Sequence, residues 1–161
     1  MTIKVGDRLP HASLRLVTGD GPKVVTPQEF FKGRKIALFG LPGAFTSTCS
    51  KSHLPGFIAH EAALKAKGVD AIAETSVNDH HVLAAWAKAS GAEGKIEFLA
   101  DGNGEFAKAL GLAYDGSEGG MGTRSRRYSM LVDDGVVKIL NIEPSPGKAE
   151  VSSAENLLKA L

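Results

Sequence analysis

The sequence is poor in cysteine and lacks a long apolar segment. Cys49 is the one cysteine among 161 residues, so neither an intramolecular disulfide nor a cysteine-ligated zinc site can form. No apolar run approaches the roughly 20 residues that span a bilayer. We therefore expect a protein without a metal centre and without a membrane-spanning helix.

An excess of charge of either sign is also missing. The 19 Lys and Arg residues nearly balance the 18 Asp and Glu residues, for a net charge of +1, which indicates neither a nucleic-acid partner nor a membrane surface. The segment from Met1 to Asp7 lacks the apolar core of a signal peptide. We expect a cytoplasmic protein, and the length fits a single domain over residues 1–161.

Apolar runs alternate with amphipathic runs along the chain. The patterns predict strands at 36–41, 69–77, 96–99, 128–132 and 136–142, and helices at 48–67, 79–90, 104–110 and from Ser152 or Ser153 onward. This order indicates an α/β fold whose mixed central sheet is flanked by helices, with early parallel strands and a late antiparallel hairpin. The thioredoxin fold satisfies this order.

Turn-forming residues refine these boundaries. Asp133-Asp134-Gly135 between two apolar runs is typical of a tight hairpin. Residues 12–25 indicate a small N-terminal β-hairpin. Pro55, inside the helix at 48–67, predicts a kink or break.

The stretch 41–50 contains the lone cysteine. It leaves a buried strand through Pro42-Gly43 and enters a helix through Thr46-Ser47-Thr48, whose side chains favour helix caps. Cys49 then falls in the first helical turn, where backbone N–H groups and the helix dipole favour a thiolate. The helix end contributes up to about 2 kcal/mol, whereas lowering a thiol pKa from about 8.5 to about 6 requires roughly 3.4 kcal/mol. A cation and hydroxyl donors are also required.

The candidate cations precede the strand at 128–132. In the run Arg124-Ser125-Arg126-Arg127, consecutive strand residues point to opposite faces. One of Arg126 and Arg127 can reach the end of the sheet near Cys49, and spacing does not choose between them. A solvated basic turn is the alternative interpretation.

These motifs resemble those of the peroxiredoxins. Pro42-x-x-x-Thr46-x-x-Cys49 matches the active-site signature of that family, and the string 42–46 is similar to the atypical type-5, or type II, subfamily. Similar segments follow at 54–57, 76–79 and 122–130. The resemblance implies a thioredoxin fold, hydroperoxide substrates, a Cys49 sulfenic acid and a homodimer; we expect no cofactor.

The resemblance also assigns residue roles. It selects Arg127, because the family's arginine immediately precedes the aromatic residue of its strand, here Tyr128. The expected catalytic residues are Cys49, Thr46, Arg127 and Pro42, and the expected substrate-binding residues are Gly43, Phe45, Thr46 and Arg127.

The sequence departs from the family pattern at cysteine positions, and the absence of a resolving cysteine decides the expected mechanism. Glu74 stands where a second, non-peroxidatic cysteine is common, and the resolving cysteine of the two-cysteine subtypes is missing. We therefore expect a one-cysteine thiol peroxidase for hydrogen peroxide and organic hydroperoxides. An external thiol, either glutathione with glutaredoxin or a thioredoxin, must reduce the Cys49 sulfenic acid.

Other interpretations compete with this one. A non-enzymatic thioredoxin-fold protein is the main alternative, and a glutathione-dependent transferase or disulfide reductase is another, although no Cys-x-x-Cys pair supports dithiol exchange. Residues 102–107 have the spacing of a dinucleotide fingerprint, which we interpret as a tight turn before a helix. His53, four residues after Cys49 on the same helical face, is expected to act structurally or through local electrostatics.

Overall fold

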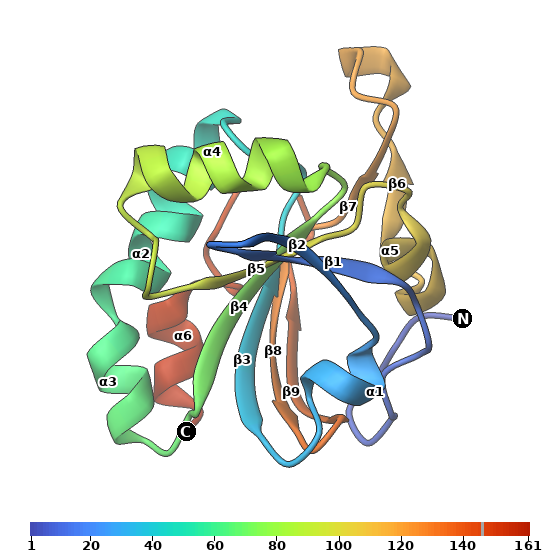
Figure 1. Ribbon diagram of the computed structural model, residues 1–161. Helices are drawn as coiled ribbons and strands as arrows, with labels where there is room; N and C mark the ends of the chain where they lie inside the picture. The colour runs from blue at the N-terminus through green and yellow to red at the C-terminus, as the bar shows by residue number, and fades with distance from the viewer. Residues whose placement is uncertain (146) are drawn as a thin grey trace.

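A seven-stranded mixed sheet organises the protein (Figure 1). The computed structural model describes residues 1–145 and 147–161. Its strands β3, β4 and β5 are parallel, and the remaining strand pairs of this sheet are antiparallel. The spatial order is β2 (Gly21–Val25), β1 (Leu14–Thr18), β5 (Glu97–Ala100), β4 (Ala71–Ser76), β3 (Lys35–Gly40), β8 (Tyr128–Asp133) and β9 (Val136–Ile142).

Helices cover both faces of this sheet, which confirms the predicted fold class. One face carries α1 (Pro27–Phe30) and α5 (Glu105–Leu110), and the other face carries α2 (Leu54–Ala59), α3 (Glu61–Ala66), α4 (His80–Ser90) and α6 (Ala154–Lys159) (Figure 1). None of the helices among the described residues has both the length and the apolar character needed to cross a membrane.

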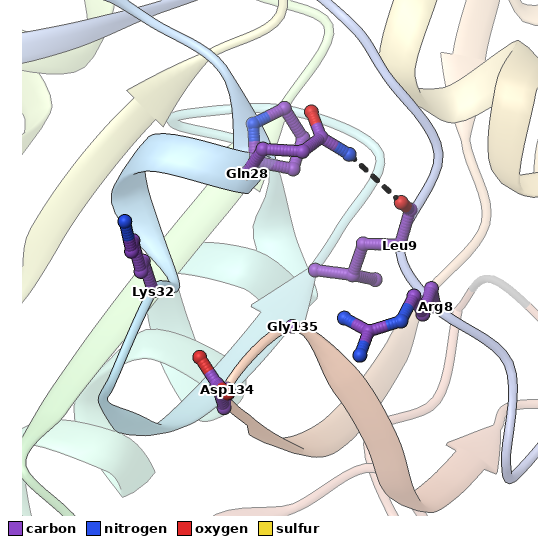
Figure 2. A pocket seen from close by; sticks show the side chains of 7 residues that line it. Arg8, Leu9, Gln28, Lys32, Asp134 and Gly135 are labelled. Carbon is purple, nitrogen blue, oxygen red and sulfur yellow. Dashed lines mark hydrogen bonds between the residues drawn. The ribbon is translucent and has the colours of Figure 1, made fainter.

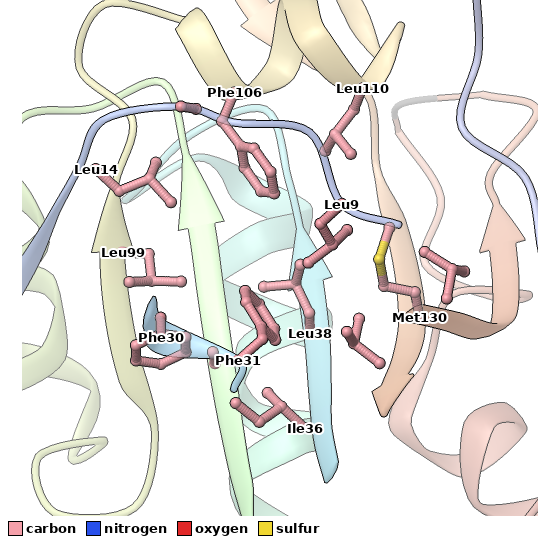
Figure 3. Packing of buried hydrophobic residues seen from close by; sticks show 14 of the residues in the cluster. Leu9, Leu14, Phe30, Phe31, Ile36, Leu38, Leu99, Phe106, Leu110 and Met130 are labelled. Carbon is pink, nitrogen blue, oxygen red and sulfur yellow. The ribbon is translucent and has the colours of Figure 1, made fainter. Parts of the chain in front are cut away.

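Alternating strand residues supply two separate apolar cores. Ile36 and Leu38 of β3 pack with α1 and α5 (Figure 3), whereas Ala37 and Phe39 pack with the helices of the other face. Because strand side chains alternate between faces, one continuous apolar run fills both cores. The predicted catalytic cysteine belongs to the second core.

The two predicted hairpins are present. Asp134 and Gly135, with φ of 50° and 81°, connect β8 to β9, and positive φ at both central residues is the requirement of the tightest hairpin turn. β1 and β2 form the N-terminal hairpin, and β1 also pairs with β5. The hairpin therefore extends the main sheet at one edge.

Helix ends follow the predicted capping residues. The Asp79 side chain accepts from the Val82 N–H at the start of α4, and Gly91 ends that helix in the left-handed conformation. Ser153 caps α6 by accepting from the Asn156 N–H. Ser152 does not cap α6, because its N–H and its hydroxyl donate to Glu143.

The segment predicted as one helix over 48–67 is divided. Cys49–His53 form a π-helical turn (η1), in which the Leu54 N–H bonds to the Cys49 carbonyl, and α2 follows directly. Pro55 is the second residue of α2. Backbone N–H groups in the first turn of a helix have no partner within that helix, so the N–H that proline lacks costs no hydrogen bond there. The break therefore falls at His60, between α2 and α3, and not at Pro55.

Four short elements were not predicted. They are α1, β6 (Ala113–Asp115), a 3₁₀ turn η2 (Ser117–Gly119) and β7 (Thr123–Ser125). β6 and β7 pair as a separate two-stranded sheet that projects beyond the main body, with η2 at its tip (Figure 1). Elements of three or four residues carry too little periodicity to be recognised in a sequence.

Candidate active site

The register of the sheet brings Cys49 and Arg127 to the same place. β3 runs antiparallel to β8 and pairs Gly40 with Tyr128, so the residue before Tyr128 lies at the end of the sheet where β3 exits. The chain leaves β3 there, turns through residues 41–46 and enters the helical segment that contains Cys49. Cys49 is fully buried at this junction.

Arg127 contacts the sulfur directly. Its Nη2 donates to Cys49 Sγ at 3.0 Å, and its Nη1 donates to His53 Nδ1 at 3.0 Å. Only 2% of Arg127 is exposed, whereas the neighbouring Arg126 is exposed to solvent. The structure thus brings Arg127, and not Arg126, to the cysteine, which is the choice that the family resemblance implied and that strand alternation alone left open.

His53 supports the guanidinium as a neutral acceptor. Burial, helped by the charge of Arg127, lowers the pKa of His53 to about 3. The ring Nε2 lies 3.0 Å from the Ser152 carbonyl, so we assign the proton to Nε2, which donates to that carbonyl and leaves Nδ1 as the acceptor for Arg127. Phe39 and Phe57 flank the ring, with centroids 5.0 and 5.6 Å away.

The hydroxyl groups before Cys49 do not cap its helix, which corrects the sequence prediction. Thr46 Oγ1 donates to the Gly43 carbonyl at 2.7 Å, and Thr48 Oγ1 donates to the Gly147 carbonyl at 2.9 Å. The helix begins when the Thr46 carbonyl accepts from the Ser50 N–H at 2.9 Å. The hydroxyls instead bind carbonyls that tertiary packing brings within reach, and sequence spacing does not reveal such partners.

The loop that carries Thr46 is held from two sides. The Ala44 N–H donates to Asn78 Oδ1 at 2.9 Å, and Arg124 Nη1 donates to the Pro42 carbonyl at 3.2 Å. Pro42 and Gly43 are buried between these contacts.

Phe45 departs from the rest of this loop. It is 56% exposed and has a φ of 64°, which is uncommon for a residue other than glycine. Its ring centroid lies 6.4 Å from that of Trp86.

Several supporting residues were missed by sequence reasoning. Glu143 accepts from both the N–H and the hydroxyl of Ser152, at 2.8 and 2.7 Å, and so holds the carbonyl that orients His53. Arg124 and Asn78 lie within segments that resemble the family, but spacing gave them no role. Glu143 carries no such signal, because its partner is fixed only by folding.

A pocket at the opposite end of the sheet lacks the predicted catalytic residues (Figure 2). It has a volume of about 280 Å³ and is lined by Arg8, Leu9, Pro27, Gln28, Lys32, Asp134 and Gly135. Gln28 Nε2 donates to the Leu9 carbonyl across one wall. Within residues 1–145 and 147–161, no group of three or more His, Cys, Asp or Glu side chains is arranged to hold a metal ion.

Comparisons with known proteins indicate the family of the chain. Residues 4–158 match the model of the Redoxin family. The chain is 53% identical over 165 residues to "Peroxiredoxin-2E-2, chloroplastic" of rice, covering 99% of this chain and 73% of the relative. Among solved structures, reduced Prx3 in complex with hydrogen peroxide from Vibrio vulnificus is similar at 50% identity and a TM-score of 0.94 over 99% of each chain.

A second solved structure extends the likeness to the type-5 group. Peroxiredoxin 5 from Alvinella pompejana is 35% identical, with a TM-score of 0.86 over 98% of this chain and 97% of its own. The chain is a peroxiredoxin of the Redoxin family. Its thioredoxin fold and its thiol peroxidase function follow from that membership.

This peroxiredoxin has an ionisable group in an unusual place. Glu74 of β4 pairs with Phe39 of β3 and is fully buried on the sheet face whose apolar core includes Cys49. Among the described residues, neither carboxyl oxygen has a hydrogen-bond partner of good geometry. Burial raises the pKa of Glu74 to about 8, an effect that nearby Ser76 partly opposes. The carboxyl group is therefore largely protonated at neutral pH.

Proposed function

We propose that this peroxiredoxin works by a one-cysteine mechanism, in which Cys49 reduces hydrogen peroxide or an organic hydroperoxide and an external thiol restores the enzyme. The observation that carries the proposal is the 3.0 Å contact between Arg127 Nη2 and Cys49 Sγ. The chain has no second cysteine to form an intramolecular disulfide. The non-enzymatic alternative gives no reason to place a permanently charged guanidinium on a buried sulfur.

In the first step, the Cys49 thiolate attacks one peroxide oxygen. A sulfur–oxygen bond forms, the O–O bond breaks, and the electron pair of that bond leaves with the second oxygen as alkoxide or hydroxide, which takes up a proton. Sulfur is oxidised to the sulfenic acid and the peroxide is reduced to an alcohol or water. Arg127 stabilises charge both on the sulfur and on the leaving oxygen, because its fork has several fixed donors and stays charged.

Thr46 binds the peroxide on the side away from Arg127. Its hydroxyl proton is already donated to the Gly43 carbonyl, so its oxygen presents lone pairs that accept a hydrogen bond from the peroxide O–H. We propose that buried Pro42 and Gly43 shield the sulfur from bulk water and that Phe45 borders the substrate entrance. Together these contacts orient the O–O bond for attack.

In the second step, an external thiolate attacks the sulfenic sulfur. A mixed disulfide forms with loss of water, and a second thiol then releases the Cys49 thiolate as an external disulfide forms. Because Cys49 is fully buried, an incoming thiol requires the surrounding turn to open. The π-helical turn Cys49–His53 has no side-chain cap, and this favours such opening.

Reductant, assembly and location belong to the same proposal. Glutathione with glutaredoxin, or a thioredoxin, supplies the external thiol, and the enzyme acts as a cytoplasmic homodimer. The rice relative, by contrast, is named as a chloroplastic protein. Fractionation of cells and the sedimentation of the purified protein test location and assembly separately.

Peroxide consumption by the purified protein tests the mechanism. We expect turnover with glutathione and glutaredoxin or with thioredoxin, and none in Cys49→Ser. Mass spectrometry of the peroxide-treated protein with one equivalent of glutathione should show a single glutathione on Cys49. Turnover that persists in Cys49→Ser, or a wild type that forms no mixed disulfide with either reductant, contradicts the proposal.

A further inference from the structure

Three nearby arginines have three different surroundings. Arg127 contacts Cys49, and Arg126 is exposed. Arg124, on β7, is half-buried and uses its guanidinium twice: Nε donates to the Met121 carbonyl at 2.8 Å, and Nη1 donates to the Pro42 carbonyl at 3.2 Å. Arg124 therefore links the projecting β6–β7 hairpin to the loop that precedes Cys49.

The absence of a side chain at Gly43 leaves room for this guanidinium. An ideal Cβ on Gly43 would lie 2.5 Å from Arg124 Nη1, closer than real contacts of this kind. Glycine at 43 thus lets the guanidinium lie against the backbone of the loop. Because the Gly43 carbonyl accepts the Thr46 hydroxyl proton, a shift of this backbone also moves Thr46.

The same loop contains a conformation that needs support. Phe45, with its φ of 64°, is a non-glycine residue in the left-handed region, and such conformations persist where the surroundings hold them. On one side Asn78 holds the Ala44 N–H, and on the other Arg124 holds the Pro42 carbonyl. Phe45 and Thr46 follow directly after these two anchors.

We propose that Arg124 is a positioning residue of the peroxidase site, which holds the Pro42 carbonyl and thereby fixes the loop that presents Thr46 to the peroxide. This inference rests on the proposed peroxidase mechanism and adds to it a residue that touches neither sulfur nor substrate. A lysine cannot replace Arg124 fully, because one ammonium group does not reproduce the two fixed donors of the planar fork.

Two reactions of Cys49 separate positioning from a general loss of structure. Stopped-flow fluorescence of Trp86 follows oxidation by hydrogen peroxide, which needs Thr46. Alkylation by iodoacetamide at a series of pH values follows the thiolate, and it does not need an oriented O–O bond. The variants are Arg124→Gln and Arg124→Lys, with Arg126→Gln as the matched control on the exposed neighbour.

We expect Arg124→Gln to react about 10- to 100-fold more slowly with peroxide, the size of loss that a misplacement of about 1 Å produces. Its alkylation should keep the pH midpoint of the wild type. The peroxide rate of Arg124→Lys should lie between those of Arg124→Gln and the wild type. Arg126→Gln should match the wild type in both reactions. Gly43→Ala should lose peroxide reactivity as well, and combining it with Arg124→Gln should add little, because both changes disrupt one contact.

The inference is overturned if Arg124→Gln oxidises as fast as Arg126→Gln, if its alkylation midpoint shifts enough to explain the loss, or if the losses multiply in the double variant. Should Arg124→Gln fail to fold, a wild-type peroxide rate in Arg124→Lys overturns it instead. If the wild-type protein reacts with peroxide no faster than free cysteine does, the peroxidase mechanism itself is contradicted. This result is distinct from the outcomes that concern the Arg124 variants.

Discussion

The charge state of single side chains sets the chemistry of the site. Arg127 stays charged at any physiological pH, whereas His53, with a pKa of about 3, stays neutral. The pair therefore places one positive charge, and not two, beside the buried Cys49. His53 orients that charge and supplies no proton of its own between about pH 5 and about pH 8.

Replacing His53 by Ala should slow oxidation by peroxide about tenfold or more, because Arg127 loses the acceptor that orients its fork. The shape of the pH–rate profile should be the same in the variant and the wild type. Rapid-mixing measurements across this pH range check both points, with exposed His81→Ala as the control. A limb of the profile that disappears with His53 would show that the histidine titrates in the reaction.

Replacing Thr46 by Val keeps the shape of the side chain and removes its hydroxyl group. The rate constant for peroxide should fall by roughly 10²–10³, the loss typical of a missing transition-state hydrogen bond. Thr46→Ser should retain most of the rate, because its hydroxyl can also donate to the Gly43 carbonyl. Equal rates in Thr46→Val and the wild type would remove Thr46 from the mechanism.

The sequence indicated which residues meet where a motif marked their positions, but not where folding alone supplied the hydrogen-bond partner. Cys49 and Arg127 were named from the sequence, and the structure brings them into contact. The choice of Arg127 over Arg126 needed the resemblance, because alternation alone allows either. Thr46 was expected to cap the helix and instead donates to the Gly43 carbonyl, a contact that depends on how the loop closes.

At the scale of an element, β4 carries an unfavourable residue in its buried face. Glu74 keeps its proton in the folded state up to its raised pKa of about 8, whereas in the unfolded chain the carboxyl loses it above its ordinary pKa of 4.5. The folded state therefore binds more protons between these values, and stability must fall as the pH rises through this range.

Glu74→Gln should remove most of this pH dependence. Relative to the wild type, the variant should gain about 3–5 kcal/mol of unfolding free energy between the low and the high end of the range, an upper limit set by the shift in pKa. Urea unfolding at a series of pH values measures the difference. Parallel curves for the two proteins would show that Glu74 titrates normally.

Elements were predictable when they were long and marked at their ends. Helices begin after the capping residues Asp79 and Ser153, and they end at Gly91 and Gly111, as expected from local chemistry. The position of the break in the 48–67 segment was not predictable, because a π-helical turn precedes Pro55 and removes the need for a kink there.

At the scale of the whole molecule, distant segments meet in one sheet. β1, near the N-terminus, pairs with β5, while β3 pairs with β8. The active-site contacts likewise join residues 49, 53, 127 and 152. Local patterns predicted most of the strands but not the order in which they lie in the sheet, because that order depends on contacts between distant segments.

The assignment of residues 1–161 to one domain predicts a single cooperative thermal transition. Because the sheet recruits strands from both ends of the chain, no part of it should melt alone. Scanning calorimetry should give equal calorimetric and van't Hoff enthalpies. Two resolved transitions would indicate two independently folding units.

Stopped-flow fluorescence during the reaction of reduced protein with hydrogen peroxide tests whether Arg127 makes Cys49 a fast peroxidatic thiol. Trp86 Nε1 donates to Ser50 Oγ at 3.1 Å, next to Cys49, so its emission should respond when the sulfur is oxidised. We predict a second-order rate constant far above that of free cysteine, and a collapse of this rate in Arg127→Gln. A wild-type rate no greater than that of free cysteine would contradict the account.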